Sequence, residues 1–175
     1  KEKIRPVAFR HERGAVMAAD GYSRISMRKK FGVVAVQSQA GAENVMGGIA
    51  QAAADNIPIL ILLGGNSLDQ ISVKPNFSAV QKYQGWVKQV EAIYSPTQVG
   101  DVMRRAFNSL KNGPPGPVVV EMTTDVCQQE VPAEYQNYKS PTSNLQMPNG
   151  TDITAAIELW QKASKPVIWA GAGVL

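Results

Sequence analysis

The sequence has little cysteine and little histidine, and this scarcity excludes several kinds of site. Its 175 residues contain a single Cys, Cys127, and a single His, His11. One Cys cannot form an internal disulfide, and one Cys with one His cannot supply the ligands of an ordinary structural zinc site. A Ser-His-Asp triad would need His11 together with a Gly-x-Ser-x-Gly elbow, and that pattern is absent. We therefore expect no side-chain metal site and no serine hydrolase.

Long hydrophobic runs and concentrated positive charge are also missing. No stretch of about eighteen apolar residues occurs, and the first residues, KEKIRP, lack the apolar region of a secretory signal. The net charge is +4, but the basic residues are dispersed apart from Arg28, Lys29 and Lys30. Nucleic-acid modules gather such residues on one face and interleave aromatics. We expect a cytoplasmic protein that binds neither nucleic acid nor membrane.

What the sequence does contain is a regular alternation of apolar strands and helices. With 44% hydrophobic residues, the chain can bury one core and part of a second. The run at 31–36 is continuous and β-branched, which is typical of a strand covered on both faces of a parallel sheet. This alternation predicts a doubly wound α/β domain. Predicted strands are 4–9, 31–36, 57–63, 85–90 and 117–122; predicted helices are 14–26, 41–54, 79–83 and 96–110, with Ser95 as a cap.

Composition divides the chain into three parts. Residues 1–127 carry the alternation, and residues 128–150 form a polar linker without periodicity. Residues 151–175 begin a second α/β unit, with a helix that Thr151 or Asp152 caps and then the apolar segment PVIWAGAG. A lone Gly-x-Gly in that segment is too weak to predict a dinucleotide site.

Two turns are expected to meet at one edge of the sheet. Glu12 follows the first predicted strand, and the turn from Ser38 to Asn44 follows the second. Ligands of parallel α/β sheets bind outside the carboxyl ends of the strands. The sequence therefore places a site between Glu12 and this turn. The alternative for Glu12 is a plain helix-terminal charge, which contributes about 0.3–1 kcal/mol, and the alternative for Gly41 and Asn44 is that they only shape a helix start.

These residues carry a family resemblance. The segment HERGAVMAADGYSR at 11–24, followed by VVAVQSQAGAEN at 33–44, resembles the pyrimidine-binding domain of thiamine-diphosphate enzymes of the acetolactate synthase and pyruvate decarboxylase type. DNIP at 55–58 and PPGPVVVE at 114–121 extend the similarity. The resemblance implies a pyrimidine-binding domain over residues 1–127 that lacks its first strand and helix. It also implies that residues 151–175 open the family's central domain.

The resemblance further implies a cofactor and the roles of particular residues. Glu12 would be the catalytic residue, which hydrogen-bonds N1′ of the aminopyrimidine ring and activates thiamine diphosphate. Such a carboxyl in a dry pocket is expected to have a raised pKa. Ala40, Gly41 and Asn44 would also bind the cofactor. The Mg²⁺ ligands are expected outside this segment, and nothing in the sequence supports FAD, which some family members bind.

The sequence departs from the family pattern at two places. The family's usual turn is Ser-Gly-Pro-Gly-Ala-x-Asn, whereas Gln39 and Ala40 stand here in place of Gly and Pro. A Phe-Gln-Glu segment in acetolactate synthases is matched only by Phe77. Gln39 and Phe77 are the candidate substrate contacts. These departures leave the substrate open within the superfamily.

The resulting expectation is a piece of a thiamine-diphosphate-dependent 2-keto acid decarboxylase or carboligase. This piece is expected to be inactive alone, and the intact protein to be a homodimer or homotetramer, because the family's site lies between two subunits. Two alternatives remain. One is a noncatalytic nucleotide- or anion-binding α/β module that uses backbone donors at its turns. The other is an inactive paralogue of the same superfamily.

Overall fold

The chain divides into two units in the computed structural model, which describes residues 4–136, 138–143 and 147–174. The units are Lys1–Ser143 and Asn144–Leu175. The first unit is built around a parallel sheet and contains every residue predicted to form the site. The second is a short helical unit.

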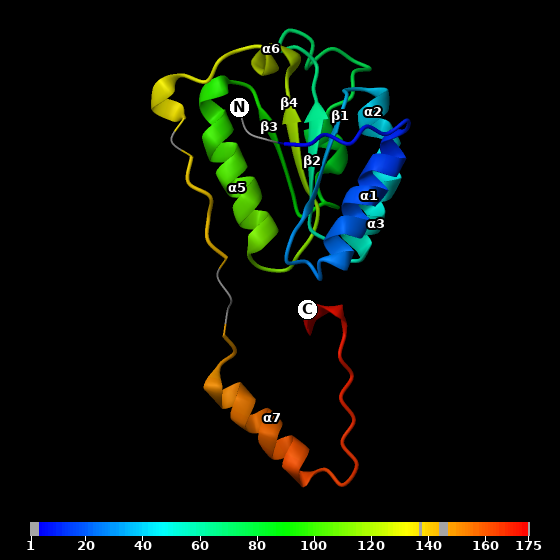
Figure 1. The fold of residues 1–175 in the computed structure, drawn as a ribbon, viewed down its shortest axis with the longest axis vertical. Coiled ribbons are helices and arrows are strands. Elements are labelled where there is room, and N and C mark those ends of the chain that lie inside the picture. Colours follow the sequence, from blue (N-terminus) through cyan, green and yellow to red (C-terminus); the bar gives the residue numbers. More distant parts are fainter. Residues whose placement is uncertain (1–3, 137, 144–146, 175) are drawn as a thin grey trace. The chain divides into compact units, whose positions relative to one another are not determined.

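The sheet has four parallel strands in the order β1-β2-β4-β3 (Figure 1). Val36 at the end of β1 lies beside Leu63 of β2, which lies beside Glu121 of β4. The carboxyl ends of these strands are therefore level, and the predicted parallel α/β architecture is confirmed. The strands are β1 Gly32–Val36, β2 Ile59–Gly64, β3 Gln89–Ile93 and β4 Val118–Met122.

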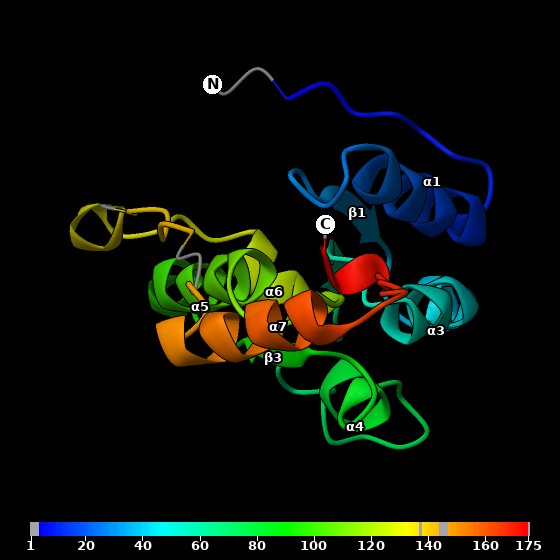
Figure 2. The same ribbon diagram turned by 90° about the horizontal axis from the view of Figure 1, so that it is seen from below.

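Helices cover both faces of this sheet. One core joins α1, α3 and α4 to inward side chains such as Ile59 and Ile61, and a second joins α5 to side chains such as Leu60 and Val120. Figure 2 shows α5 on one side of the strands and α1, α3 and α4 on the other. The helices of this unit are α1 Glu12–Ile25, α2 Ala40–Asn44, α3 Met46–Ala54, α4 Ala79–Tyr83, α5 Val99–Lys111 and α6 Thr124–Cys127.

Helix α1 is fixed tightly against its neighbours. A Cβ added at Gly48 of α3 would lie 2.2 Å from Val16 Cγ1, so the Val16 side chain of α1 packs directly on the backbone of α3. The buried Ser23 hydroxyl donates to Pro58 O at 2.7 Å and accepts from Gly32 N at 2.8 Å. These contacts bind α1 to the starts of β1 and β2, and they set where its first residue, Glu12, stands.

The predicted first strand at 4–9 is wrong. Residues 4–10 are not in a strand, and the side chains of Ile4, Val7 and Phe9 are exposed. An alternating sequence forms a strand only where a neighbouring strand pairs with it, and within the described residues this segment has no such neighbour. For the same reason β1 is an edge strand. Val33 is 55% exposed, so the expectation of cover on both faces is also wrong.

Other element boundaries differ locally. The predicted helix at 41–54 is divided at Val45 into α2 and α3. The predicted strand at 85–90 begins later, at Gln89, because Gly85 has φ +92° and the amides of Trp86 and Val87 bond back to Tyr83 O in a turn. Helix α6 was not predicted.

The cap at Ser95 is confirmed. Its hydroxyl accepts from Thr97 N at 3.4 Å, at the start of the 3-10 turn Pro96–Gln98 that leads into α5. A second 3-10 turn, Ala133–Tyr135, lies in the segment after α6.

The second unit consists of α7 Gly150–Lys162 and the segment that follows it. Asn149 caps α7, accepting from Thr151 N at 3.1 Å, whereas Thr151 or Asp152 was predicted to do so. Residues 166–169 form no strand, and the described end carries only the 3-10 turn Ala172–Val174. Among the residues described in both units, no helix has the length and hydrophobicity to cross a membrane.

Candidate functional site

The site begins at the amino terminus of α1. His11 is the N-cap residue, with extended backbone angles, and its Nδ1 accepts a hydrogen bond from Arg13 N at 3.1 Å. This satisfies one of the backbone donors that a helix start leaves without a partner. The only His in the chain therefore has a local structural role, and the next residue, Glu12, takes the first helical position.

The turn after β1 brings a second group to Glu12. Asn44 Nδ2 donates to Glu12 Oε2 at 3.1 Å, across 32 positions of sequence. A Cβ added at Gly41 would lie 2.6 Å from Gln37 Cγ and 3.6 Å from Glu12 Oε1. A side chain at this position would displace Gln37 and lie against the carboxylate, so glycine leaves Glu12 Oε1 uncovered on this side. Ala40 precedes it as the first residue of α2. The structure thus brings these four predicted site residues together at the carboxyl end of β1.

The carboxylate of Glu12 is more acidic than the sequence suggested. Its pKa lies below the usual value, chiefly because its own backbone N–H donates to it and also because Asn44 does. The expected raised pKa required a dry pocket, but the side chain is 27% exposed. In this chain alone, hydrogen bonding outweighs burial, so the direction of the shift corrects that expectation.

Gln39 occupies the most unusual backbone conformation of the turn. Its φ of +57° and ψ of −117° are rare for a residue with a side chain. The side chain points into the protein: Nε2 donates to Asn66 Oδ1 at 2.7 Å and to Asn76 Oδ1 at 3.2 Å. Oε1 accepts from Phe77 N at 3.2 Å. A substrate contact by Gln39 stays a prediction, and its amide already has three partners inside the chain.

Phe77 is joined to the turn 38–44 through its backbone amide, which donates to Gln39 Oε1. Its side chain is only 7% exposed and packs edge-on against Tyr83, with ring centroids 6.0 Å apart. The buried Tyr83 hydroxyl donates to Ala42 O of α2 at 2.6 Å, and burial raises its pKa. Tyr83 therefore binds α2 directly, and the Phe77 ring packs against Tyr83. Substrate contact by Phe77 also stays a prediction.

A further buried carboxylate was not singled out from the sequence. Glu121 is 8% exposed at the carboxyl end of β4, and its Oε2 accepts from Ala79 N, the first residue of α4, at 3.2 Å. Burial raises the pKa of this carboxyl. The available signal was one acidic residue within the otherwise apolar strand VVVEM. In the structure this carboxylate binds the amino terminus of α4.

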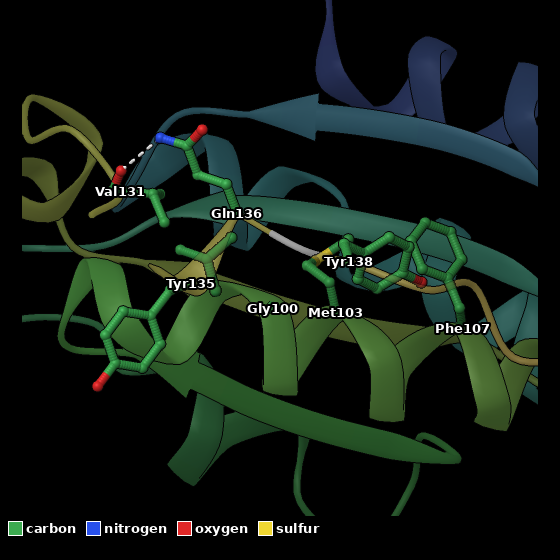
Figure 3. A pocket seen from close by; sticks show the side chains of 8 residues that line it. Gly100, Met103, Phe107, Val131, Tyr135, Gln136 and Tyr138 are labelled. Carbon is green, nitrogen blue, oxygen red and sulfur yellow. Dashed lines mark hydrogen bonds between the residues drawn. The ribbon is translucent and has the colours of Figure 1, made fainter. Parts of the chain in front are cut away.

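Among the described residues, neither a metal centre nor the apolar hollow beside α5 lies at the cluster of Glu12, Ala40, Gly41 and Asn44. Within residues 4–136, 138–143 and 147–174, no group of three or more His, Cys, Asp or Glu side chains is placed to hold a metal ion. An apolar hollow of about 330 Å³ lies between α5 and the segment after α6 (Figure 3). Gln136 Nε2 donates to Val131 O at 2.8 Å in its wall. No predicted site residue lines it; its lining residues are Val99, Gly100, Met103, Phe107, Val131, Tyr135, Gln136 and Tyr138.

Comparison with known proteins shows which family this chain resembles. The model of the family described as "Thiamine pyrophosphate enzyme, N-terminal TPP binding domain" matches residues 1–92. The acetolactate synthase large subunit of Buchnera aphidicola (from Acyrthosiphon pisum) is 31% identical over 98% of this chain and 31% of its own length. That of Haemophilus influenzae is 32% identical over the same shares.

A plant relative has similar coverage of this chain. The chloroplastic acetolactate synthase of Arabidopsis thaliana is 29% identical over 98% of this chain and 26% of its own length. The chain thus spans less than a third of the length of the curated relatives that it matches.

Proposed function

The chain belongs to the thiamine pyrophosphate enzymes, whose N-terminal domain it matches over residues 1–92, and from this membership we propose that it forms the pyrimidine-binding side of a thiamine diphosphate site. The activity proposed for the whole protein is that of an acetolactate synthase-like decarboxylase or carboligase of 2-keto acids. The observation that carries the proposal is the contact of Glu12 with Asn44 beside Gly41. The names of the relatives support the same class of reaction.

The residues of the cluster fit an aminopyrimidine ring. A ring nitrogen needs a hydrogen-bonding carboxylate, and Glu12 offers one that remains partly exposed. Gly41 places backbone without a side chain beside this carboxylate, where an added Cβ would lie 3.6 Å from Glu12 Oε1. Asn44 holds one oxygen of the carboxylate and thereby fixes the direction of the other.

Thiamine diphosphate, when bound, supplies the electron sink for cleaving or forming the bond next to the keto group of the substrate. In the proposal, Glu12 holds a proton between its carboxyl and N1′ of the pyrimidine. Asn44 keeps that carboxyl oriented. Exclusion of water from the closed site would raise the Glu12 pKa, which makes proton sharing with a ring nitrogen easier.

The rest of the site is proposed to come from outside the described residues. No metal cluster occurs among them, so the Mg²⁺ ligands and the diphosphate contacts would be supplied by another part of the protein or by a second subunit. We propose in addition that the intact protein is a homodimer or homotetramer whose subunits share the site. The cytoplasmic location is proposed with it, and cell fractionation would measure it.

The test is Glu12→Gln in the full-length protein that carries this chain. This substitution keeps the shape of the side chain and its ability to pair with Asn44, but it removes the group that holds the proton. We expect exchange of the thiazolium C2 proton with deuterium to slow by about 10²-fold or more. The matched control is Glu43→Gln, which makes the same change at an exposed position of the same turn.

The two outcomes separate the proposal from its alternatives. Loss of exchange in Glu12→Gln with normal exchange in Glu43→Gln supports the role of Glu12. Unchanged exchange in Glu12→Gln contradicts it. Titration of the unaltered protein with thiamine diphosphate plus Mg²⁺, and separately with ATP and NAD, addresses the noncatalytic module. Binding of nucleotide without binding of thiamine diphosphate would favour that module.

A further inference from the structure

We propose that Gln39 is a positioning residue that fastens the segment 66–77 to the turn 38–44, and that this fastening selects among 2-keto acids by chain length. The selection step rests on the proposed function, whereas the fastening does not. The observation that carries the proposal is the set of three hydrogen bonds from one carboxamide to three residues of the segment.

The backbone at Gln39 is held in a costly conformation. A positive φ of 57° with ψ −117° suits glycine, which has no Cβ, and disfavours any other residue. Such a conformation persists only where the surrounding contacts over-determine it. Gln39 has no side-chain role in capping α2. Its compensation must therefore come from the contacts that its carboxamide makes elsewhere.

Those contacts use the whole carboxamide. A glutamine side chain has two N–H donors, and at Gln39 these go to Asn66 Oδ1 and Asn76 Oδ1. Its oxygen accepts from Phe77 N. With both donors used, the side chain has no N–H left to offer a substrate. Any effect of Gln39 on substrate therefore passes through the segment that it holds.

Residues 66–77 are also joined to one another by hydrogen bonds near the Gln39 carboxamide. Asn66 Nδ2 donates to Phe77 O at 3.1 Å, so the two ends of the segment are closed on each other. Asn76 Nδ2 donates to Gln70 O at 3.1 Å and closes a smaller loop inside it. Gln39 bonds to the closing residues of both loops. Removing its carboxamide should loosen the segment as a unit.

The segment starts at the edge where the site lies. It leaves β2 just after Gly64, where an added Cβ would be 3.0 Å from Ser38 N of the turn. The start of the segment therefore lies against the turn 38–44, at the carboxyl edge of the sheet, where ligands of parallel α/β folds bind. Because Gln39 joins the segment to the turn, a shift of the segment would change the space beside the turn.

The next part of the chain has separate anchors. Glu121 holds Ala79 N, and the Tyr83 hydroxyl holds Ala42 O, so α4 is attached to the sheet and to α2 independently of Gln39. The expected effect of altering Gln39 is thus confined to 66–77. This limit distinguishes loss of the fastening from general unfolding.

The first measurement is amide hydrogen exchange in the full-length protein. In Gln39→Glu the two donors are lost, and in Gln39→Gly the carboxamide is lost while the backbone strain is relieved. We expect peptides covering 66–77 to exchange about tenfold faster in both variants, with peptides covering α1 unchanged. The control is Gln129→Glu, the same change at an exposed position outside the network.

The second measurement compares 2-keto acids from pyruvate to 2-ketohexanoate. In Gln39→Glu and Gln39→Gly we expect the ratio of kcat/KM between long and short substrates to change about fivefold or more, through KM. C2 proton exchange is measured in the same variants, and its loss would show that the turn 38–44 had itself moved, which would contradict an effect confined to the segment. A structural role without selection would leave that ratio unmoved.

The outcomes decide the two parts separately. Unchanged hydrogen exchange over 66–77 in both variants would overturn the fastening. Faster exchange with an unaltered substrate ratio would overturn the selection of substrate. Absence of C2 exchange in the parent protein with cofactor and Mg²⁺ would defeat the proposed function and the selection with it, while hydrogen exchange would still decide the fastening.

Discussion

Glu12 owes its low pKa to two N–H donors, its own backbone amide and the side chain of Asn44. A carboxyl whose folded pKa is lowered contributes stability above its unfolded pKa, and that contribution is lost as the pH falls through the folded value. The contact between Glu12 and Asn44 should therefore stabilise the chain at neutral pH and cease to do so in acid.

Asn44→Ala removes the second of these donors. We expect the pKa of Glu12 to rise toward its usual value, because one hydrogen bond to the charged form is lost. The measurement is a pH titration of the Glu side-chain carboxyl carbons by NMR in the full-length protein without cofactor, with Glu12→Gln identifying the signal. Gln129→Ala, at an exposed amide with no part in this contact, should leave the titration unmoved. A Glu12 pKa that does not rise in Asn44→Ala would show that the contact is not formed in solution.

Ser23 is the residue that joins α1 to two strands by buried hydrogen bonds. Ser23→Ala leaves Gly32 N and Pro58 O without this partner in a buried place, which should cost about 1–3 kcal/mol of unfolding free energy. Urea denaturation of the full-length protein would measure it. Ser109→Ala on α5, away from this junction, serves as the comparison. Equal midpoints for the two variants would mean that water replaces the hydroxyl.

The packing of α1 on α3 offers a sharper comparison, since α3 contains two adjacent glycines. Gly48→Ala would place a methyl group 2.2 Å from Val16 Cγ1, whereas at Gly47 an added methyl meets nothing within 4 Å. We expect Gly48→Ala to destabilise the protein by about 1–3 kcal/mol through overpacking. Gly47→Ala should stabilise it by about 0.5–1 kcal/mol, because glycine is a poor helix former.

The same pair tests how α1 positions Glu12. A helix pushed away from α3 moves its first residue, so Gly48→Ala should also weaken binding of thiamine diphosphate, while Gly47→Ala should not. Thermal unfolding and cofactor titration of both variants would measure the two effects. Equal stability of the two variants would show that α1 and α3 are not in contact at Gly48.

The sequence predicted some elements and site residues better than others. Features that depend on neighbouring residues were predicted, and features that depend on contacts between segments far apart in sequence were not. Helix α1 and strands β2 and β4 follow from local periodicity, whereas Glu12, Gly41 and Asn44 were singled out as a site through the resemblance to a family motif. The strand expected at 4–9 depended on a distant partner that periodicity cannot report. The break at Val45 and the burial of Glu121 likewise depend on contacts between segments far apart in sequence.

The whole molecule is expected to work as an assembly of subunits. In the proposed site the described residues would supply the carboxylate for the pyrimidine, and a second surface would bring the metal. Sedimentation of the full-length protein with thiamine diphosphate and Mg²⁺ should show at least a dimer at concentrations where it is active. Full activity of a monomer at every dilution would contradict a shared site.

Strand β1 has a consequence for handling the protein. It is an edge of the sheet within the described residues, and one of its faces shows the Val33 side chain to solvent. An exposed edge presents unpaired amides and carbonyls, which a strand from another molecule can join. We therefore expect the unit Lys1–Ser143, expressed by itself, to fold but to associate with other copies through this edge. Val33→Lys would place a charge on this edge strand and should keep such preparations monodisperse.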